Sequence, residues 1–113
     1  MSNVSEIQFR IAMDENQVPE AIEWKVPGEG ESGKCDAAFL TIWDRNEKNT
    51  FRIDLWTKDM MVDDMQIFFH QMLLSMSDTY KRATGDEANA VEIRKFAMEL
   101  GERMGIVKRD EEA

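Results

Sequence analysis

The segment Thr50–Gly85 constrains the fold most, because the spacing of its apolar residues changes from alternation to helical spacing within one short stretch. At its start, apolar and polar residues alternate, which places Arg52, Asp54 and Trp56 on one face of a predicted strand. Further along, apolar residues recur every three or four positions, the pattern of an amphipathic helix. The segment therefore predicts a junction between a strand region and a helical region.

The residues before this junction predict an antiparallel sheet. Alternating segments at 5–13 and 21–26 indicate half-buried strands, and the segment 36–44, apolar on both faces, indicates a central strand. Pro27–Lys34 holds three glycines and a proline, which predicts a flexible loop. Together with the strand of the opening segment, these patterns predict a four-stranded antiparallel β-meander over about residues 5–57.

The residues after the junction predict two helices over about residues 61–105, followed by a frayed tail at 106–113. Gly85 suits a left-handed helix end, and Asp86 suits the N-cap of the second helix. Because the link between the helices is short, we expect them to be antiparallel neighbours. The charged side chains near the two ends of the first helix match its dipole: Asp59, Asp63, Asp64, Lys81 and Arg82.

Strands followed by helices predict a single α+β domain over residues 1–113, with both helices packed on one face of the sheet. We expect Phe51, Ile53 and Leu55 to face the helices, because they form the apolar side of their strand.

The opposite side of that strand would then stay uncovered. It carries Arg52, Asp54 and Trp56, and the preceding strand adds apolar side chains beside them. An exposed aromatic and apolar patch is typical of an interface. We therefore interpret these three residues as a protein-binding face, which a homodimer or another protein could occupy.

The charge of the chain argues against anionic partners. The formal net charge is −9 over 113 residues, both halves are acidic, and no run of basic residues predicts a basic patch or tail. Such a chain repels nucleic acid and bare membrane surfaces, so we expect no nucleic-acid binding, no membrane insertion and a preference for basic protein segments. The single cysteine, Cys35, excludes an internal disulfide, and the N-terminus does not resemble a signal peptide. These features predict a cytoplasmic protein.

Gly28–Cys35 matches the first seven positions of a phosphate-binding P-loop. Three features oppose that interpretation. Cys35 stands where a magnesium-binding hydroxyl is needed, a strand follows instead of a helix, and Glu29 and Glu31 would repel phosphate. We interpret the segment as a solvated hairpin loop.

The remaining polar residues show no catalytic spacing. His70 is the only histidine, and a partly buried, hydrogen-bonded side chain is the simpler explanation for it. Asp59, Asp63 and Asp64 lack the spacing of a metal-binding loop, and their place at a helix start explains them. The sequence therefore predicts no catalytic residue, no metal site and no cofactor.

The run IWDRNEKNTFRIDLWTKDMMVDDMQIFFHQMLLSMSDTYKRATGDE and the later EIRKFAMELGERMGI resemble the gliding motility-associated protein GldC family of Bacteroidetes bacteria. The likeness covers roughly residues 5–106, and its most specific part is RIDLWTKDMMV at Arg52–Val62. The family more often has proline where this chain has Met61. The resemblance implies an accessory role in gliding, beside membrane-anchored motor and secretion machinery at the inner membrane, and it supplies no active-site residues.

Three functions remain open. The favoured hypothesis is a non-enzymatic cytoplasmic interaction module of the gliding machinery. The alternative is a small acidic protein, similar to secretion chaperones, that holds a client segment. The least favoured is a metal-dependent enzyme built on Asp54, Asp59, Asp63 or His70.

Overall fold

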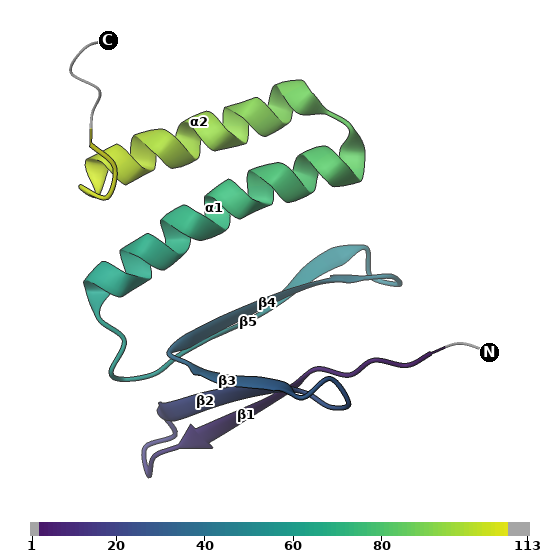
Figure 1. The fold of residues 1–113 in the computed structure, drawn as a ribbon, viewed down its shortest axis with the longest axis vertical. Coiled ribbons are helices and arrows are strands. Elements are labelled where there is room, and N and C mark those ends of the chain that lie inside the picture. The colour runs from purple at the N-terminus through teal and green to yellow at the C-terminus, as the bar shows by residue number, and fades with distance from the viewer. Residues whose placement is uncertain (1–2, 109–113) are drawn as a thin grey trace. The chain divides into compact units, whose positions relative to one another are not determined.

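The computed structural model describes residues 3–108, which form five strands and two helices (Figure 1). Contacts divide the chain into a strand unit that ends at Met60 and a helical unit that begins at Met61. The elements are β1 (Gln8–Met13), β2 (Pro19–Val26), β3 (Glu31–Cys35), β4 (Ala37–Asp44), β5 (Asn49–Trp56), α1 (Val62–Thr84) and α2 (Glu87–Arg103). Neither described helix is long and apolar enough to cross a membrane.

The strands form two antiparallel sheets, one of three strands in the order β1-β2-β3 and one of the two strands β4 and β5. Only Asp36 separates β3 from β4 (Figure 1). The α+β class and the antiparallel pairing are confirmed, but the prediction of a single four-stranded meander is wrong. The packing of both helices on one sheet face stays a prediction.

The missed strand is β3, which occupies the second half of the predicted loop. Gly33 pairs with Trp24 of β2. A Cβ atom at Gly33 would lie only 2.8 Å from the indole nitrogen of Trp24, so the large ring lies directly over the glycine. Residues with low strand propensity can form a strand when a cross-strand aromatic ring covers them.

The hairpin β4–β5 is set by the turn that joins its strands. Asp44 accepts hydrogen bonds from the backbone N–H groups of Asn46, at 3.1 Å, and Glu47, at 2.7 Å. Lys48 has a positive φ of 53° and donates its N–H to the carbonyl of Asp44. This turn pairs Asp44 with Asn49 and so fixes which residues face each other along the whole hairpin.

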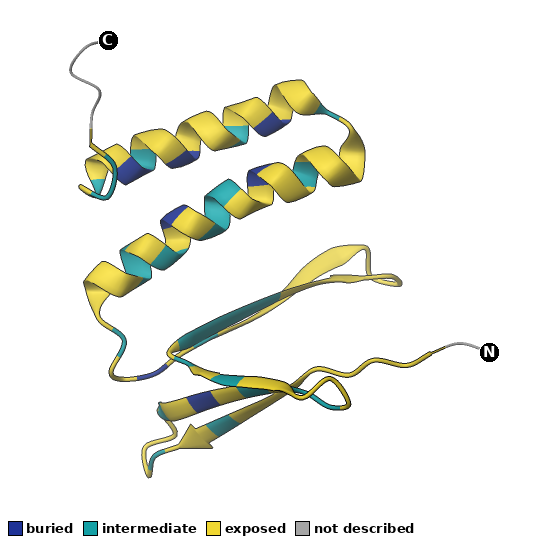
Figure 2. Cartoon of the chain, viewed as in Figure 1, coloured by how far each residue is buried: buried dark blue, intermediate teal, exposed yellow. Residues whose placement is uncertain are grey.

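The core of the strand unit is small (Figure 2). Among the described residues, the largest fully buried side chains are Ile22, in the middle of β2, and Thr57, just after β5. Many large apolar side chains of this unit remain exposed, which leaves it rich in surface that can bind other molecules.

The helical unit is an antiparallel pair that packs through small residues (Figure 1). Ala90, Ala97 and Gly101 of α2 are buried, opposite His70 and Ser77 of α1. The small residues let the two helices approach closely, so that side chains of α1 reach the backbone of α2.

The helix ends follow the local signals in the sequence. Gly85 ends α1 with a left-handed φ of 75° and an N–H···O bond to Lys81, and Asp86 caps α2 by accepting the N–H of Asn89. After α2, the N–H groups of Ile106 and Val107 both bond to the carbonyl of Gly101. The predicted tail therefore begins with bonded residues, and positions 109–113 lie outside the described residues.

Candidate functional site

The register of the hairpin brings the predicted binding residues together with partners from β4. Arg52 lies opposite Thr41, Asp54 opposite Phe39, and Trp56 opposite Ala37. Because directly paired residues share a face of an antiparallel sheet, these side chains lie on one side of the hairpin. We call this surface the Arg52 face and include in it Trp43, which lies on the same side of β4.

Arg52 is held in the Arg52 face by several polar contacts. Its guanidinium donates to Asp54 through two nitrogens, at 2.9 and 3.4 Å, and to the hydroxyl of Thr41 at 2.7 Å. Its central carbon also lies 5.8 Å from the centre of the Phe39 ring, within cation–π range. Both charged side chains remain well exposed, so the ion pair adds little stability. Its main effect is to hold the guanidinium in one orientation on the surface.

Two tryptophans lie on either side of this arginine along the hairpin. Trp43 is 65% exposed and Trp56 is 52% exposed. Tryptophan and arginine are the residue types that most often contribute strongly to protein interfaces, since each offers a large contact area and hydrogen-bond donors. The Arg52 face can therefore bind an apolar surface that also presents an acceptor group.

The opposite side of the hairpin differs chemically. It carries Leu40 and Ile42 of β4 together with Phe51, Ile53 and Leu55 of β5. Phe51, Ile53 and Ile42 are exposed, and no charged residue interrupts the group. This side is apolar as far as Asp44 and Asn49 at the turn, and its predicted packing against the helices stays a prediction.

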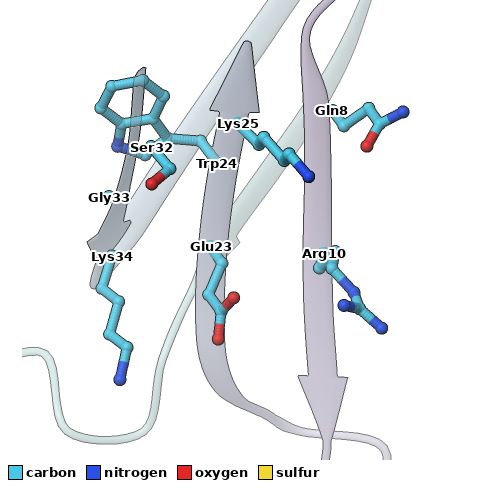
Figure 3. A pocket seen from close by; sticks show the side chains of 8 residues that line it. All are labelled: Gln8, Arg10, Glu23, Trp24, Lys25, Ser32, Gly33 and Lys34. Atoms are coloured by element: carbon cyan, nitrogen blue, oxygen red, sulfur yellow. The ribbon is translucent and has the colours of Figure 1, made fainter. Parts of the chain in front are cut away.

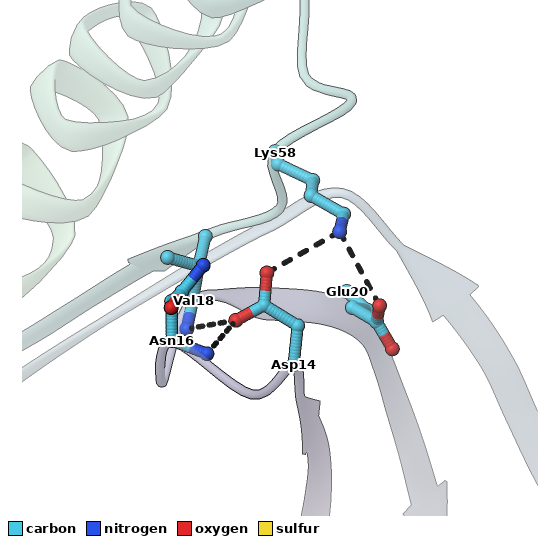
Figure 4. Close-up of polar contacts among 5 residues, drawn as sticks. All are labelled: Asp14, Asn16, Val18, Glu20 and Lys58. Carbon is cyan, nitrogen blue, oxygen red and sulfur yellow. Dashed lines mark hydrogen bonds and ion pairs between the residues drawn. The ribbon is translucent and has the colours of Figure 1, made fainter.

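A polar corner connects the hairpin to the three-stranded sheet (Figure 4). Lys58 follows β5 and reaches Asp14 and Glu20, with each N···O distance 3.3 Å, while its N–H bonds to the carbonyl of Pro19. Beside it, the buried Thr57 donates its N–H to the carbonyl of Asp36 at 2.8 Å. These bonds attach the end of β5 to the start of β2 and to the bend between the two sheets.

The charges of this corner reinforce one another. The N–H groups of Val18 and Asn16 and the amine of Lys58 lower the pKa of Asp14 below its usual value. Hydrogen bonds to Asp14 and then Glu20 raise the pKa of Lys58. The corner therefore stays ionised on both sides near neutral pH, and its role is to position the hairpin.

The other candidates from the sequence do not gather into a site. His70 is buried in the helical pair, where its Nδ1 lies 3.0 Å from the carbonyl of Ala97; because a carbonyl only accepts, Nδ1 carries the hydrogen. Asp63 and Asp64 lie in the first turn of α1, with Asp59 ahead of it. Within residues 3–108, no three His, Cys, Asp or Glu side chains are placed to share a metal ion.

The P-loop pattern also lacks its supporting structure. Its last residues, Gly33, Lys34 and Cys35, lie in strand β3, and strand β4 follows where a helix would be needed. Burial raises the pKa of the Cys35 thiol, which disfavours the thiolate form.

Thr41 and Phe39 are the site residues that the sequence did not identify. They orient Arg52 from the neighbouring strand, and only the register shows which residues of β4 lie opposite it. The signal that could have found them is Asp44, whose turn-forming position fixes that register.

Comparison with known proteins identifies one family. The family model described as gliding motility-associated protein GldC-like matches residues 19–106, which span β2 through α2 and include the whole Arg52 face. No curated protein and no solved structure matches the chain.

Proposed function

The chain belongs to the GldC-like family of gliding motility-associated proteins, and from this premise we propose that it serves gliding as a non-enzymatic protein-interaction module. The Arg52 face is its contact surface. One observation carries the proposal: Thr41, Asp54 and Phe39 hold an exposed guanidinium in place between two exposed tryptophans. Such a surface loses little side-chain entropy when it binds.

The partner that this proposal implies is a protein of the gliding or secretion machinery, reached from the cytoplasmic side of the inner membrane. The net charge of −9 supports electrostatic steering toward a basic segment of that partner. Binding should then weaken as salt is added, because exposed charges are screened within about 8–10 Å at ordinary ionic strength. Affinity that does not change with salt would contradict the steering.

The test combines binding with motility. In a gliding bacterium that expresses this protein, Trp56→Lys should reduce both co-purification of machinery components and gliding, because it replaces a large contact surface with a charge. Trp56→Phe is the matched control, since it keeps an aromatic ring at the same position. Far-UV circular dichroism of the purified variants checks that both fold. Unchanged co-purification and gliding in Trp56→Lys would refute the proposed contact surface.

The alternative function is a chaperone-like holder of a secreted client. The observation that favours it is the apolar side of the hairpin, where Ile42, Phe51 and Ile53 are exposed. A chaperone would protect an unfolded, amphipathic segment from proteolysis, and Phe51→Asp would remove that protection. An interaction module would instead prefer a folded partner and depend on Trp56.

A further inference from the structure

The three-stranded sheet gathers cations that lie far apart in the sequence. In one row across the sheet, Glu23 of β2 lies opposite Arg10 of β1 and Lys34 of β3. In a second row, two residues further along β2, Lys25 lies opposite Gln8 of β1 and Ser32 of β3. All six share one side of the sheet, because they are direct partners or lie two residues apart. We call this surface the basic face. The sequence predicted no basic patch, and for this surface that prediction is wrong.

The three cations of the basic face are exposed, and no described residue forms a hydrogen bond or ion pair with the side chain of Arg10, Lys25 or Lys34. The strand unit contains contrasting cases, since Arg52 is paired with Asp54 and Lys58 with Asp14 and Glu20. A cation that has no intramolecular partner can bind an external anion without breaking an existing contact.

A pocket of about 460 Å³ lies over the same surface (Figure 3). Besides the cations it is lined by polar side chains of Gln8 and Ser32 and by Trp24, whose ring covers Gly33. In Figure 3 the charged side chains come from all three strands, with Glu23 between Arg10 and Lys34. The pocket thus offers spread positive charge and hydrogen-bond groups.

We propose that the basic face binds a short acidic segment of a protein partner, laid extended across the three strands. β1 and β3 are about 10 Å apart, and Glu23 lies between Arg10 and Lys34, where its carboxylate would repel a single phosphate group placed among the three cations. Carboxylates spaced along a peptide match such an array, because each can approach a different cation.

The size of the basic face also limits the occupant. It is only two rows of residues long, Glu23 lies within it, and the chain as a whole carries a net charge of −9. A long polyanion such as nucleic acid would run past the cations onto acidic surface and be repelled. A short acidic segment can end within the face.

This site is separate from the Arg52 face, because none of the residues that line the pocket belongs to β4 or β5. The proposal therefore does not depend on the proposed function. The same molecule would present one surface to a basic partner and another to an acidic segment.

The experiment uses the full chain and a fluorescein-labelled peptide of about ten alternating glutamate and threonine residues, with a glutamine–threonine peptide as the uncharged control. In low-salt buffer, fluorescence anisotropy should show binding of the glutamate peptide only. The double variant K25E/K34E should weaken that binding at least about tenfold, since two attractive contacts become repulsive.

The matched control is R45E/K48E, which changes the net charge equally but lies in the β4–β5 hairpin loop. It should alter peptide affinity by less than about twofold, because neither residue lines the pocket and so neither contacts the bound peptide. Trp56→Lys should also leave peptide binding intact. Circular dichroism confirms that each variant folds.

Three results would overturn the proposal. The first is no binding of the glutamate peptide, and the second is equal loss of binding in both double variants, which would reveal only net-charge attraction. The third is displacement of the peptide by tripolyphosphate or by a single-stranded oligonucleotide at concentrations below those at which the peptide itself binds, which would assign the face to phosphate ligands.

Discussion

The helical unit and the strand unit of this chain are held by different kinds of contact. In the helical unit, α1 side chains bond directly to α2 carbonyls: His70 to Ala97 at 3.0 Å and Ser77 to Ala90 at 2.7 Å. In the strand unit, backbone ladders and a polar corner around Lys58 hold the strands, and little apolar surface is fully buried.

This difference indicates how the two units divide their roles. Tight packing through small residues makes a helical pair that tolerates little change at its contact surface. A strand unit with a small core leaves its aromatic and charged side chains outside, where another molecule can reach them. Both of the binding surfaces proposed above lie in the strand unit.

The largest expected effect tests the small core of the strand unit. Ile22 is 1% exposed, so Ile22→Ala should lower the free energy of unfolding by about 3 kcal/mol, through lost burial and a cavity. The control is Ile42→Ala in the same unit, where the side chain is 46% exposed and the loss should be about 1 kcal/mol or less.

Two probes make this experiment informative about both units. Trp24, Trp43 and Trp56 all belong to the strand unit, so tryptophan fluorescence during urea unfolding reports on it alone, while circular dichroism at 222 nm reports mainly on the helices. If the chain unfolds as the single domain that its sequence predicts, Ile22→Ala shifts both transitions equally. A fluorescence transition that moves while the dichroism transition stays would contradict a single cooperative domain.

The next effect tests close packing in the helical unit. A Cβ atom at Gly101 would lie 2.6 Å from Cε1 of His70 and 2.9 Å from Cγ2 of Val107. Gly101→Val should therefore cost about 2 kcal/mol by overpacking. Ala88→Val, on the exposed surface of the same helix, should cost only about 0.5 kcal/mol, the difference in helix propensity. Equal losses in the two variants would show that the helices do not pack tightly at Gly101.

The same contrast explains which parts of the fold could be predicted from the sequence. Helix ends depend on neighbouring residues, so Gly85 and Asp86 predicted where α1 ends and α2 begins. Strand β3 depends on Trp24 covering Gly33 from another strand, and no pattern within residues 27–34 contains that information. Because β3 was not predicted, the sequence indicated a single meander where the structure has two sheets.

The candidate site follows the same logic. Alternation along one strand was enough to place Arg52, Asp54 and Trp56 on one face. The contribution of Thr41 to that face, and the assembly of the basic face from three strands, depend on register between strands. Register is a pairwise property, and along the chain only a turn residue such as Asp44 indicates it.

A smaller effect tests the hydrogen bonds between the helices. Ser77→Ala removes the bond from the serine hydroxyl to the carbonyl of Ala90 and should cost about 1 kcal/mol. Ser75→Ala, at an exposed position of α1, makes the same chemical change without that bond. Because both substitutions gain the same helix propensity, the difference between their unfolding free energies isolates the bond. A difference near zero would mean that the bond contributes nothing to stability.

The smallest effect compares the units by acid titration. The N–H and amide of Asn89 and the hydroxyl of Tyr80 lower the pKa of Asp86, while the N–H of Val18 does the same for Asp14. A carboxylate with a lowered pKa in the folded state takes up its proton first in the unfolded state. The stability that such a carboxylate adds to the folded state is therefore complete above its unfolded-state pKa of about 3.9. That stability is lost as pH falls through its lower folded-state pKa.

Asp14→Asn and Asp86→Asn should therefore each make the free energy of unfolding fall less steeply between about pH 5 and pH 2. If the two units unfold separately, fluorescence should report the change for Asp14 and dichroism the change for Asp86; in one cooperative domain both probes report both. Asp78→Asn, at an exposed position of α1, serves as the control for removing a carboxylate. If the acid profiles of both variants match that of the parent protein, the hydrogen bonds of these carboxylates add no stability. For Asp14, this result would mean that the polar corner holds the hairpin through its backbone hydrogen bonds alone.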